Sequence, residues 1–161
     1  MQHPFQIRPL TEFSDFVTFE CRVPSVNAFI HDGLTEALIE NQCETYGVYD
    51  GNTLVAFFAL KEDGSFVDYQ GAKSALEIAF LAVDKQYELQ GIGRSIIQEI
   101  SQIALSKTCN YYRYLTVKAL VITHPKKDKY EAVSFYRKCH FSQAELYNPA
   151  TDTLSMYLQL R

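Results

Sequence analysis

The N-terminal half of the chain carries two apolar patterns that predict secondary structure. Over residues 25–41, apolar side chains fall near one helical stripe, which predicts a helix with Gly33 as its weak point. Residues 45–60 contain two apolar runs on either side of Asp50 and Gly51. This pair tolerates the positive φ of tight turns, so the pattern predicts a β-hairpin.

The centre of the chain predicts a strand followed by a helix. In residues 75–83, "ALEIAFLAV", Ile78 and Phe80 would point to one face, and further apolar side chains would point to the other. Apolar residues on both faces predict a central strand that is covered on both sides. The segment after it predicts a helix, whose buried side is expected to contain Ile92, Ile96, Ile100, Ile103 and Ala104.

Shorter patterns complete the expected fold. We expect further strands over residues 5–10, 116–123 and 153–160, and a short helix over 129–139. Strands outnumber helices and the helices fall between strands, which is typical of an α/β (α+β) fold with a mixed sheet and helices on both faces. No repeat or linker interrupts the 161 residues, so residues 1–161 are expected to form a single domain.

Composition narrows the class of protein. Apolar residues make up 47% of the chain and charged residues 21%, which is ordinary for a soluble globular protein. The net charge of −4 disfavours a general nucleic-acid binder. The four cysteines show neither CxxC spacing nor a disulfide framework, and no signal or membrane-spanning pattern is present, so a cytoplasmic protein is expected. The four histidines are scattered, which disfavours a metal site.

The stretch "ELQGIGRSIIQEI", residues 88–100, is a candidate anion site. Two glycines precede a helix, whose first turn has backbone N–H groups without intrahelical partners. A Walker loop would need a lysine after the glycines, and a Rossmann fingerprint would need a third glycine where Ile96 stands. The pyrophosphate loop of acyl-CoA-dependent acetyltransferases remains, beside the alternative that Gly91 and Gly93 only turn the chain.

Two longer stretches resemble a known family. "EIAFLAVDKQYELQGIGRSII", residues 77–97, is similar to the central motif of the Gcn5-related N-acetyltransferase (GNAT) superfamily, and "AVSFYRKCHF", residues 132–141, resembles its second motif. The resemblance covers nearly the whole chain, is loose before residue 60, and implies a mixed, mostly antiparallel sheet of the GNAT type. Two positions depart from the family pattern. Glu88 stands where the family has Gln or Arg, and His140 stands where it usually has glycine.

The resemblance implies which residues contact acetyl-CoA, the expected co-substrate. Main-chain groups that pair with the pantetheine arm would come from Leu81, Ala82 and Val83. Backbone N–H groups around the pyrophosphate would come from Leu89, Gln90, Gly91, Ile92, Gly93 and Arg94, assisted by the Ser95 hydroxyl. Because these contacts are made by the backbone, we expect the Glu88 carboxylate to turn outward. The basic run at 125–129 either approaches the 3′-phosphate or is a solvated loop.

Acetyl transfer to a primary amine requires a base for the amine and an acid for the leaving thiolate. Glu77 heads the central motif, where burial would raise the pKa of its carboxyl group towards neutral, so it is the expected base. A chain of water molecules and a solvated Glu77 stay as alternatives. Tyr136 matches the family's acid, since a phenol can protonate the sulfur. Neighbouring Tyr112 and Tyr114 are expected to be packing residues.

The expected function is an acetyl-CoA-dependent N-acetyltransferase with direct transfer in a ternary complex. The acceptor would be a small-molecule or peptide amine, and its pocket would involve residues 23–33 and 147–152. Two alternatives stay open. One is a toxin that acetylates aminoacyl-tRNA and has an antitoxin partner, which the acidic balance disfavours. The other is a non-catalytic acyl-CoA-binding module, which Glu88 in the loop favours. Members of this family often form homodimers, and the sequence leaves that state open.

Overall fold

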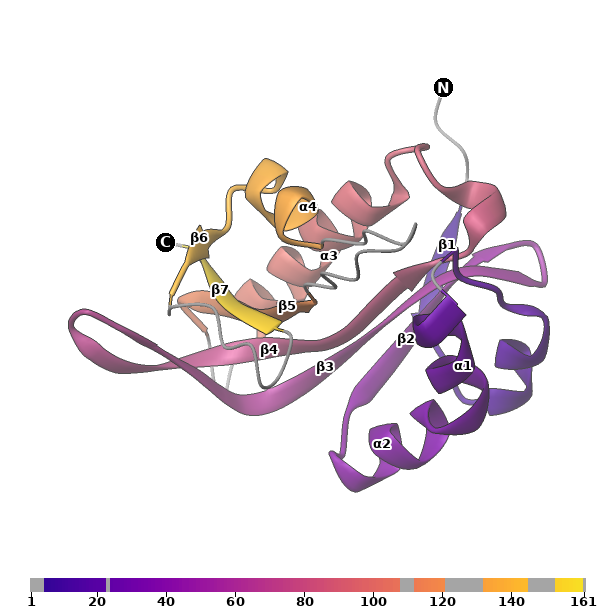
Figure 1. Cartoon of the computed structure of the whole chain (residues 1–161), viewed down its shortest axis with the longest axis horizontal. Coiled ribbons are helices and arrows are strands. Elements are labelled where there is room, and N and C mark those ends of the chain that lie inside the picture. The colour runs from indigo at the N-terminus through magenta and orange to yellow at the C-terminus, as the bar shows by residue number, and fades with distance from the viewer. Residues whose placement is uncertain (1–4, 23, 108–111, 121–131, 145–152, 161) are drawn as a thin grey trace. The chain divides into compact units, whose positions relative to one another are not determined.

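A computed structural model describes residues 5–22, 24–107, 112–120, 132–144 and 153–160. Figure 1 labels the helices and strands. The contacts within the chain define two compact units, each of which is described by itself. The first unit comprises Met1–Lys61 and Ala79–Ile96, and the second comprises Glu62–Ile78 and Ile97–Arg161.

The described strands form one mixed, mostly antiparallel sheet of seven strands in the order β1-β2-β3-β4-β5-β7-β6. Neighbours pair antiparallel in β1·β2, β2·β3, β5·β7 and β6·β7, whereas β4 and β5 are parallel. This confirms the predicted mixed, mostly antiparallel sheet. The strands are β1 (Gln6–Pro9), β2 (Glu44–Asp50), β3 (Thr53–Asp68), β4 (Gly71–Val83), β5 (Tyr114–Leu120), β6 (Ser142–Gln143) and β7 (Thr153–Gln159).

The helix predicted over residues 25–41 is two helices, because the chain breaks at Gly33. The Gly33 N–H donates to Phe29 O at the end of the first helix, and Gly33 O accepts from the Ala37 N–H at the start of the second. A Cβ at position 33 would lie 3.3 Å from the Phe29 ring, so glycine suits this break. The helices are η1 (Phe13–Thr18), α1 (Pro24–Asp32), α2 (Leu34–Glu40), η2 (Lys85–Tyr87), α3 (Ile92–Ser106) and α4 (Val133–Lys138).

The core of the first unit lies between its helices and the strands β2 and β3. Every residue of β3 from Leu54 to Leu60 is buried, which explains the continuous apolar run in the sequence. The Phe57 ring contacts Phe16 and Phe19 edge-on, with centroids 4.9 and 5.3 Å away. Leu34 and Leu38 of α2 join this cluster. Burial of these apolar side chains fixes the segment before α1 close to β3.

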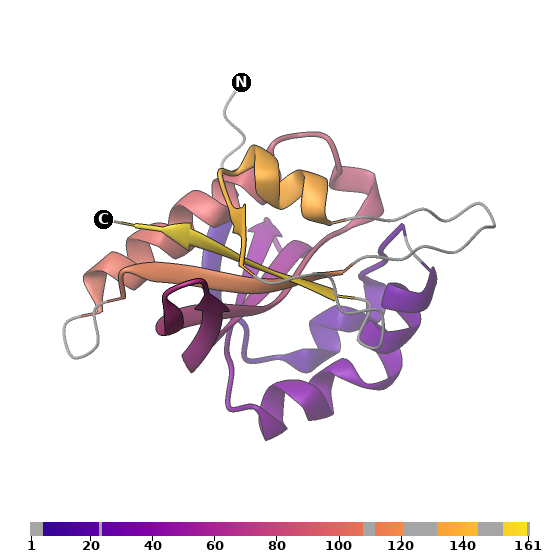
Figure 2. The same ribbon diagram turned by 60° about the vertical axis from the view of Figure 1, so that its left-hand side comes forward.

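The second unit has its core around β5 and β7, which lie side by side (Figure 2) and pair from Tyr114↔Gln159 to Leu120↔Thr153. Its largest fully buried side chains include Ile100, Leu115 and Met156.

The expected buried stripe of α3 is confirmed at Ile92, Ile96, Ile100 and Ala104, whereas Ile103 is only half-buried and the adjacent Ile97 is buried instead. None of the described helices is long and apolar enough to cross a membrane.

Candidate functional site

The glycine-containing turn of the first unit has the backbone of an anion-binding loop. Leu89 and Gly91 both have left-handed φ, +63° and +78°, on either side of Gln90. Nothing lies within 4 Å of a Cβ built on Gly91, so the φ angle, rather than space, requires glycine there. Ile92 begins α3 with its side chain buried, and the Ser95 N–H makes an early bond of the helix, to Gly91 O. The N–H groups of the first helical turn are therefore available to an anion.

The remaining loop residues lie at the surface. Gln90, Arg94 and Ser95 are exposed, and the Leu89 side chain is fully exposed. Leu81, Ala82 and Val83, at the end of β4, are half-buried. Each sequence-predicted cofactor residue therefore belongs to the first unit, and seven of them form one continuous segment, residues 89–95.

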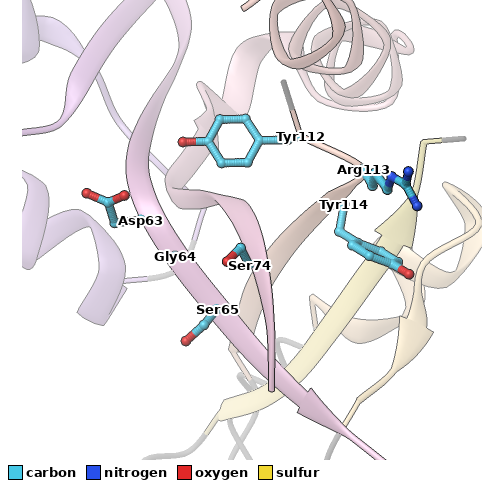
Figure 3. A pocket seen from close by; sticks show the side chains of 7 residues that line it. All are labelled: Asp63, Gly64, Ser65, Ser74, Tyr112, Arg113 and Tyr114. Atoms are coloured by element: carbon cyan, nitrogen blue, oxygen red, sulfur yellow. The ribbon is translucent and has the colours of Figure 1, made fainter. Parts of the chain in front are cut away.

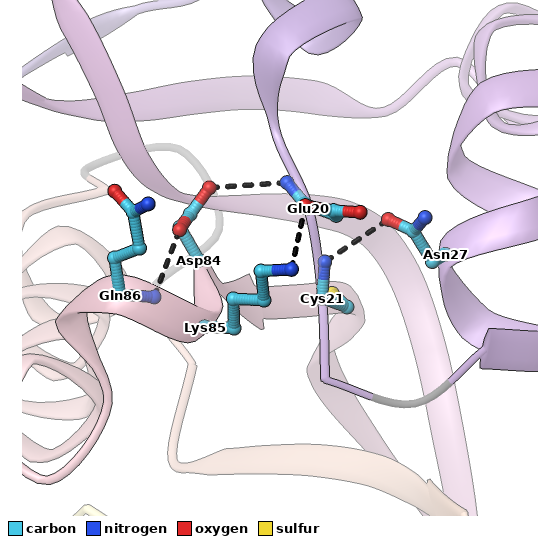
Figure 4. A network of polar contacts seen from close by, with 6 residues as sticks. All are labelled: Glu20, Cys21, Asn27, Asp84, Lys85 and Gln86. Atoms are coloured by element: carbon cyan, nitrogen blue, oxygen red, sulfur yellow. Dashed lines mark hydrogen bonds and ion pairs between the residues drawn. The ribbon is translucent and has the colours of Figure 1, made fainter.

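Asp84 anchors this loop to the segment before α1 (Figure 4). Its carboxylate is buried and accepts the Glu20 N–H at Oδ2 and the Gln86 N–H at Oδ1, each at 3.0 Å. The Asp84 N–H donates to Val55 O at 2.8 Å. Asp84 thus joins β4, η2 and the segment at residue 20 through main-chain groups. Sequence reasoning missed it, although an Asp directly after a strand is a turn-capping signal, because its carboxylate can accept the backbone N–H two residues further along the chain.

Two ion pairs surround the same segment. Lys85 Nζ lies 2.8 Å from Glu20 Oε2. Their mutual hydrogen bond, followed by the attraction of their charges, lowers the pKa of Glu20 and raises that of Lys85. Arg22 Nε lies 3.5 Å from Glu88 Oε2. Glu88, the departure from the family pattern, is therefore directed towards a cation.

Cys21 lies between these pairs and remains a thiol at neutral pH. Its N–H donates to Asn27 Oδ1 of α1 at 3.0 Å. Burial, followed by the negative charges of Asp84 and Glu88, raises the pKa of the Cys21 thiol to about 12. A protonated thiol is a poor nucleophile, so Cys21 is unsuited to an acetyl-cysteine intermediate.

Glu77, the expected base, lies on the part of β4 that belongs to the second unit. It is half-buried and pairs with Thr116 of β5. On β3, a Cβ at Gly64 would come within 2.7 Å of the Glu77 Cβ. Because Gly64 has no Cβ, the Cβ of Glu77 can occupy this space.

Tyr136, the expected acid, is buried in α4 among aromatic rings. The rings of Phe135 and Phe141 contact it edge-on, with centroids 5.0 and 5.3 Å away. The Phe141 N–H donates to Tyr136 O at the end of the helix. His140 has a φ of +74°, the left-handed conformation that glycine adopts most easily, and this explains why the family usually has glycine at that position.

A pocket of about 490 Å³ opens in the second unit (Figure 3). Tyr112 and Tyr114, expected to be packing residues, contribute to its wall. Burial, followed by the negative charge of Glu62, raises the pKa of the Tyr112 phenol. The lining consists of Asp63, Gly64, Ser65, Ser74, Tyr112, Arg113 and Tyr114. Gly64 is the lining residue that also adjoins the Cβ of Glu77.

Some expected residues fall outside the described chain. These are the basic run at 125–129 and the turn at 147–152, whereas most of residues 23–33 form α1. Within the described ranges, no three His, Cys, Asp or Glu side chains are grouped so that they could hold a metal ion.

A mixed sheet with a turn of exposed backbone N–H groups between a strand and a helix suits the binding of a phosphate-containing cofactor. The model of the acetyltransferase (GNAT) family matches residues 10–141, and the chain belongs to this family. The predicted N-acetyltransferase class, with acetyl-CoA as the co-substrate of the family, is thereby confirmed. No curated protein sequence matches the chain at a significant level.

Solved structures share the fold at low sequence identity. A bacterial toxin has a TM-score of 0.74 and 13% identity, with 99% of this chain and 92% of that chain covered. The protein AtaT in complex with acetyl-methionyl-tRNAfMet has a TM-score of 0.71 and 16% identity over 96% of this chain and 94% of that one. A mutant of the toxin AtaT bound to the C-terminus of the antitoxin AtaR has a TM-score of 0.71 and 16% identity, covering 97% and 92%. At these identities the likeness establishes the fold alone.

Proposed function

We propose that this protein transfers the acetyl group of acetyl-CoA directly to a primary amine in a ternary complex. The observation that carries the proposal is the turn at residues 89–95, where left-handed φ angles at Leu89 and Gly91 precede the first turn of α3. This backbone presents successive N–H groups to an anion, as a pyrophosphate requires. The cofactor supplies the activated acetyl thioester.

In this proposal the chain binds the cofactor mainly through its backbone. N–H groups of residues 89–94 and the Ser95 hydroxyl hold the pyrophosphate, and main-chain groups of Leu81, Ala82 and Val83 pair with the pantetheine arm. The exposed Arg94 side chain adds positive charge at the same end of α3. Asp84 keeps β4 and η2 in place behind this loop through its two backbone hydrogen bonds.

The protons are handled by residues of the second unit. Glu77 takes the proton of the attacking amine, either directly or through a water molecule. The amine nitrogen forms the new C–N bond as the C–S bond breaks, and Tyr136 donates a proton to the departing sulfur. The products are an N-acetylated amine and CoA with a protonated thiol, so the step needs no oxidant and no metal.

The proposal is tested by measuring CoA release with a panel of amines and identifying the acetylated product by mass spectrometry. The panel should contain polyamines, amino-acid amides and peptides with N-terminal or lysine amines. Acetylation of at least one amine that follows saturation kinetics in both substrates is the expected result. Acetyl-CoA binding without turnover of any acceptor would support the non-catalytic module instead.

Aminoacyl-tRNA is the second candidate acceptor, because a solved structure of the same fold, AtaT, contains acetyl-methionyl-tRNAfMet. The acidic net charge of −4 disfavours such a polyanionic acceptor. Charged tRNA therefore belongs in the same panel. A loss of free α-amine on charged tRNA at rates above those of every small amine would select this function, and a search for an antitoxin partner would follow.

A further inference from the structure

The five charged side chains grouped around residues 84–88, before the proposed cofactor loop, carry more negative than positive charge. In the first unit, Glu20, Asp84 and Glu88 lie against Lys85 and Arg22, which leaves a net charge of −1 on these five groups. Such a balance opposes a polyanion, and Glu88 is the carboxylate closest in sequence to the loop. The group that neutralises the negative charge of Glu88 therefore affects anion binding at the loop.

We infer that Arg22 is a positioning residue for cofactor binding, which compensates the charge of Glu88 so that residues 89–95 accept a pyrophosphate. This inference rests on the proposed function and deepens it. Arg22 Nε lies 3.5 Å from Glu88 Oε2, and Glu88 directly precedes the first loop residue. Arg22 comes from the segment before α1, outside both sequence motifs of the family resemblance.

The backbone before Arg22 is held in place by three hydrogen bonds. The Glu20 N–H donates to Asp84 Oδ2 and the Cys21 N–H donates to Asn27 Oδ1, as Figure 4 shows. The Lys85 N–H donates to Glu20 O. Arg22 therefore starts from a fixed position beside the loop, which reduces the entropy lost when its side chain pairs with Glu88.

The charge of Glu88 acts on the loop over a short range. Coulomb interactions between partly exposed groups persist over about 8 Å at physiological ionic strength, which includes neighbouring residues of a tight turn. The Glu88 side chain is 30% exposed and that of Arg22 is 66% exposed, so solvent screens the pair only in part. Removal of Arg22 would leave the Glu88 carboxylate without its paired cation, beside a ligand with several negative charges.

The inference predicts a specific pattern in a double-mutant cycle. Arg22→Ala should weaken CoA binding by about 3- to 10-fold at low salt, and the loss should shrink as salt is added. Glu88→Gln should bind CoA as well as or better than the wild type. The double variant should bind like Glu88→Gln alone, because Arg22 acts through Glu88. Arg137→Ala removes an exposed arginine of the second unit that does not line the pocket, and it serves as the charge control.

The experiment measures the dissociation constants of CoA by calorimetry at two salt concentrations, and the KM of acetyl-pantetheine, which lacks the pyrophosphate. Arg22→Ala should leave the acetyl-pantetheine KM unchanged, and Arg22→Gln should repeat the effect on CoA. Equal loss in the double variant and in Arg22→Ala would overturn the inference, since Arg22 would then act independently of Glu88. Failure of the wild-type chain to bind CoA would overturn the proposed function as well, and the first titration detects it.

Discussion

The carboxylate of Asp84 links two segments that are 64 positions apart in the chain. Its Oδ2 accepts the Glu20 N–H and its Oδ1 accepts the Gln86 N–H, both at 3.0 Å. One buried side chain thus fixes the segment before α1 next to η2, which directly precedes the proposed cofactor loop. Charged acceptors of backbone N–H groups make stronger hydrogen bonds than neutral ones.

Replacement of Asp84 should therefore destabilise the protein and weaken cofactor binding together. Asp84→Ala leaves two N–H groups without their acceptor and should lower the free energy of unfolding by about 2–4 kcal/mol. Asp84→Asn retains one acceptor oxygen and should lose less. Urea unfolding and acetyl-CoA titration of both variants measure the two effects. An Asp84→Ala variant as stable as the wild type would show that these hydrogen bonds contribute little.

Gly91 and Gly51 provide a matched pair for the loop. Both have left-handed φ, +78° and +61°, and nothing lies within 4 Å of a Cβ at either position. Alanine at either site should cost about 1–2 kcal/mol of stability through backbone strain. Only Gly91→Ala should also weaken acetyl-CoA binding, because its strain changes the direction of the loop N–H groups. Equal acetyl-CoA affinity in the two variants would remove Gly91 from the proposed site.

Glu77 and Tyr136 should affect turnover rather than cofactor affinity. Glu77→Gln and Tyr136→Phe should each lower kcat by about 100-fold or more, since general acid–base catalysis typically contributes that much, with an unchanged acetyl-CoA dissociation constant. Glu99→Gln on the exposed face of α3 and Tyr69→Phe at the exposed Tyr69 are the matched controls. Rates in Glu77→Gln and Tyr136→Phe that equal those of their controls would contradict the assigned roles.

The raised pKa of the Tyr49 phenol predicts how the stability of the protein responds to alkaline pH. Its hydroxyl donates to Asp15 Oδ2 at 2.7 Å, and burial, then this hydrogen bond and the Asp15 charge, raise the pKa of the phenol to about 12. The unfolded phenol ionises near pH ~10. The stability that this group contributes is therefore fully present below about pH 10 and is lost as the pH rises from there to about 12.

Tyr49→Phe should accordingly cost about 1.5–3 kcal/mol at pH 7, where a hydrogen bond to a charged acceptor is lost, and less as the pH approaches 12. The exposed Tyr69 gives the control variant Tyr69→Phe, which should match the wild type at every pH. Urea unfolding at pH 7, 9 and 11 under reducing conditions measures both. A constant difference between Tyr49→Phe and the wild type across this range would contradict the assigned cause.

The elements that the sequence predicts best are those set by local patterns. The β2–β3 hairpin forms at Asp50 and Gly51, and α3 begins at Ile92 directly after the glycine turn. In both cases a regular apolar period meets a residue suited to positive φ, so neighbouring residues alone specify the element. The break at Gly33 differs, because Gly33 has a φ of −135° and the apolar stripe continues past it, so the pattern predicted one helix where the chain forms two.

Features that depend on distant residues were not predictable from these patterns. β3 continues to Asp68 and β4 starts at Gly71, although the sequence between the apolar runs is polar. There Phe66 stacks on Tyr157 of β7 at 4.7 Å, a contact between residues 91 positions apart. The Arg22–Glu88 pair also joins residues far apart in the sequence, so no local pattern predicts it.

The central claim is that residues 89–95 hold the pyrophosphate of CoA, and calorimetric titration of the pure protein with acetyl-CoA tests it most directly. Desulfo-CoA and adenine nucleotides without a pantetheine arm are the controls. Saturable binding in the micromolar range, tighter for acetyl-CoA than for either control, is the predicted result. Absence of binding by every CoA species would contradict the claim, and would mean that the GNAT fold is retained here without its cofactor.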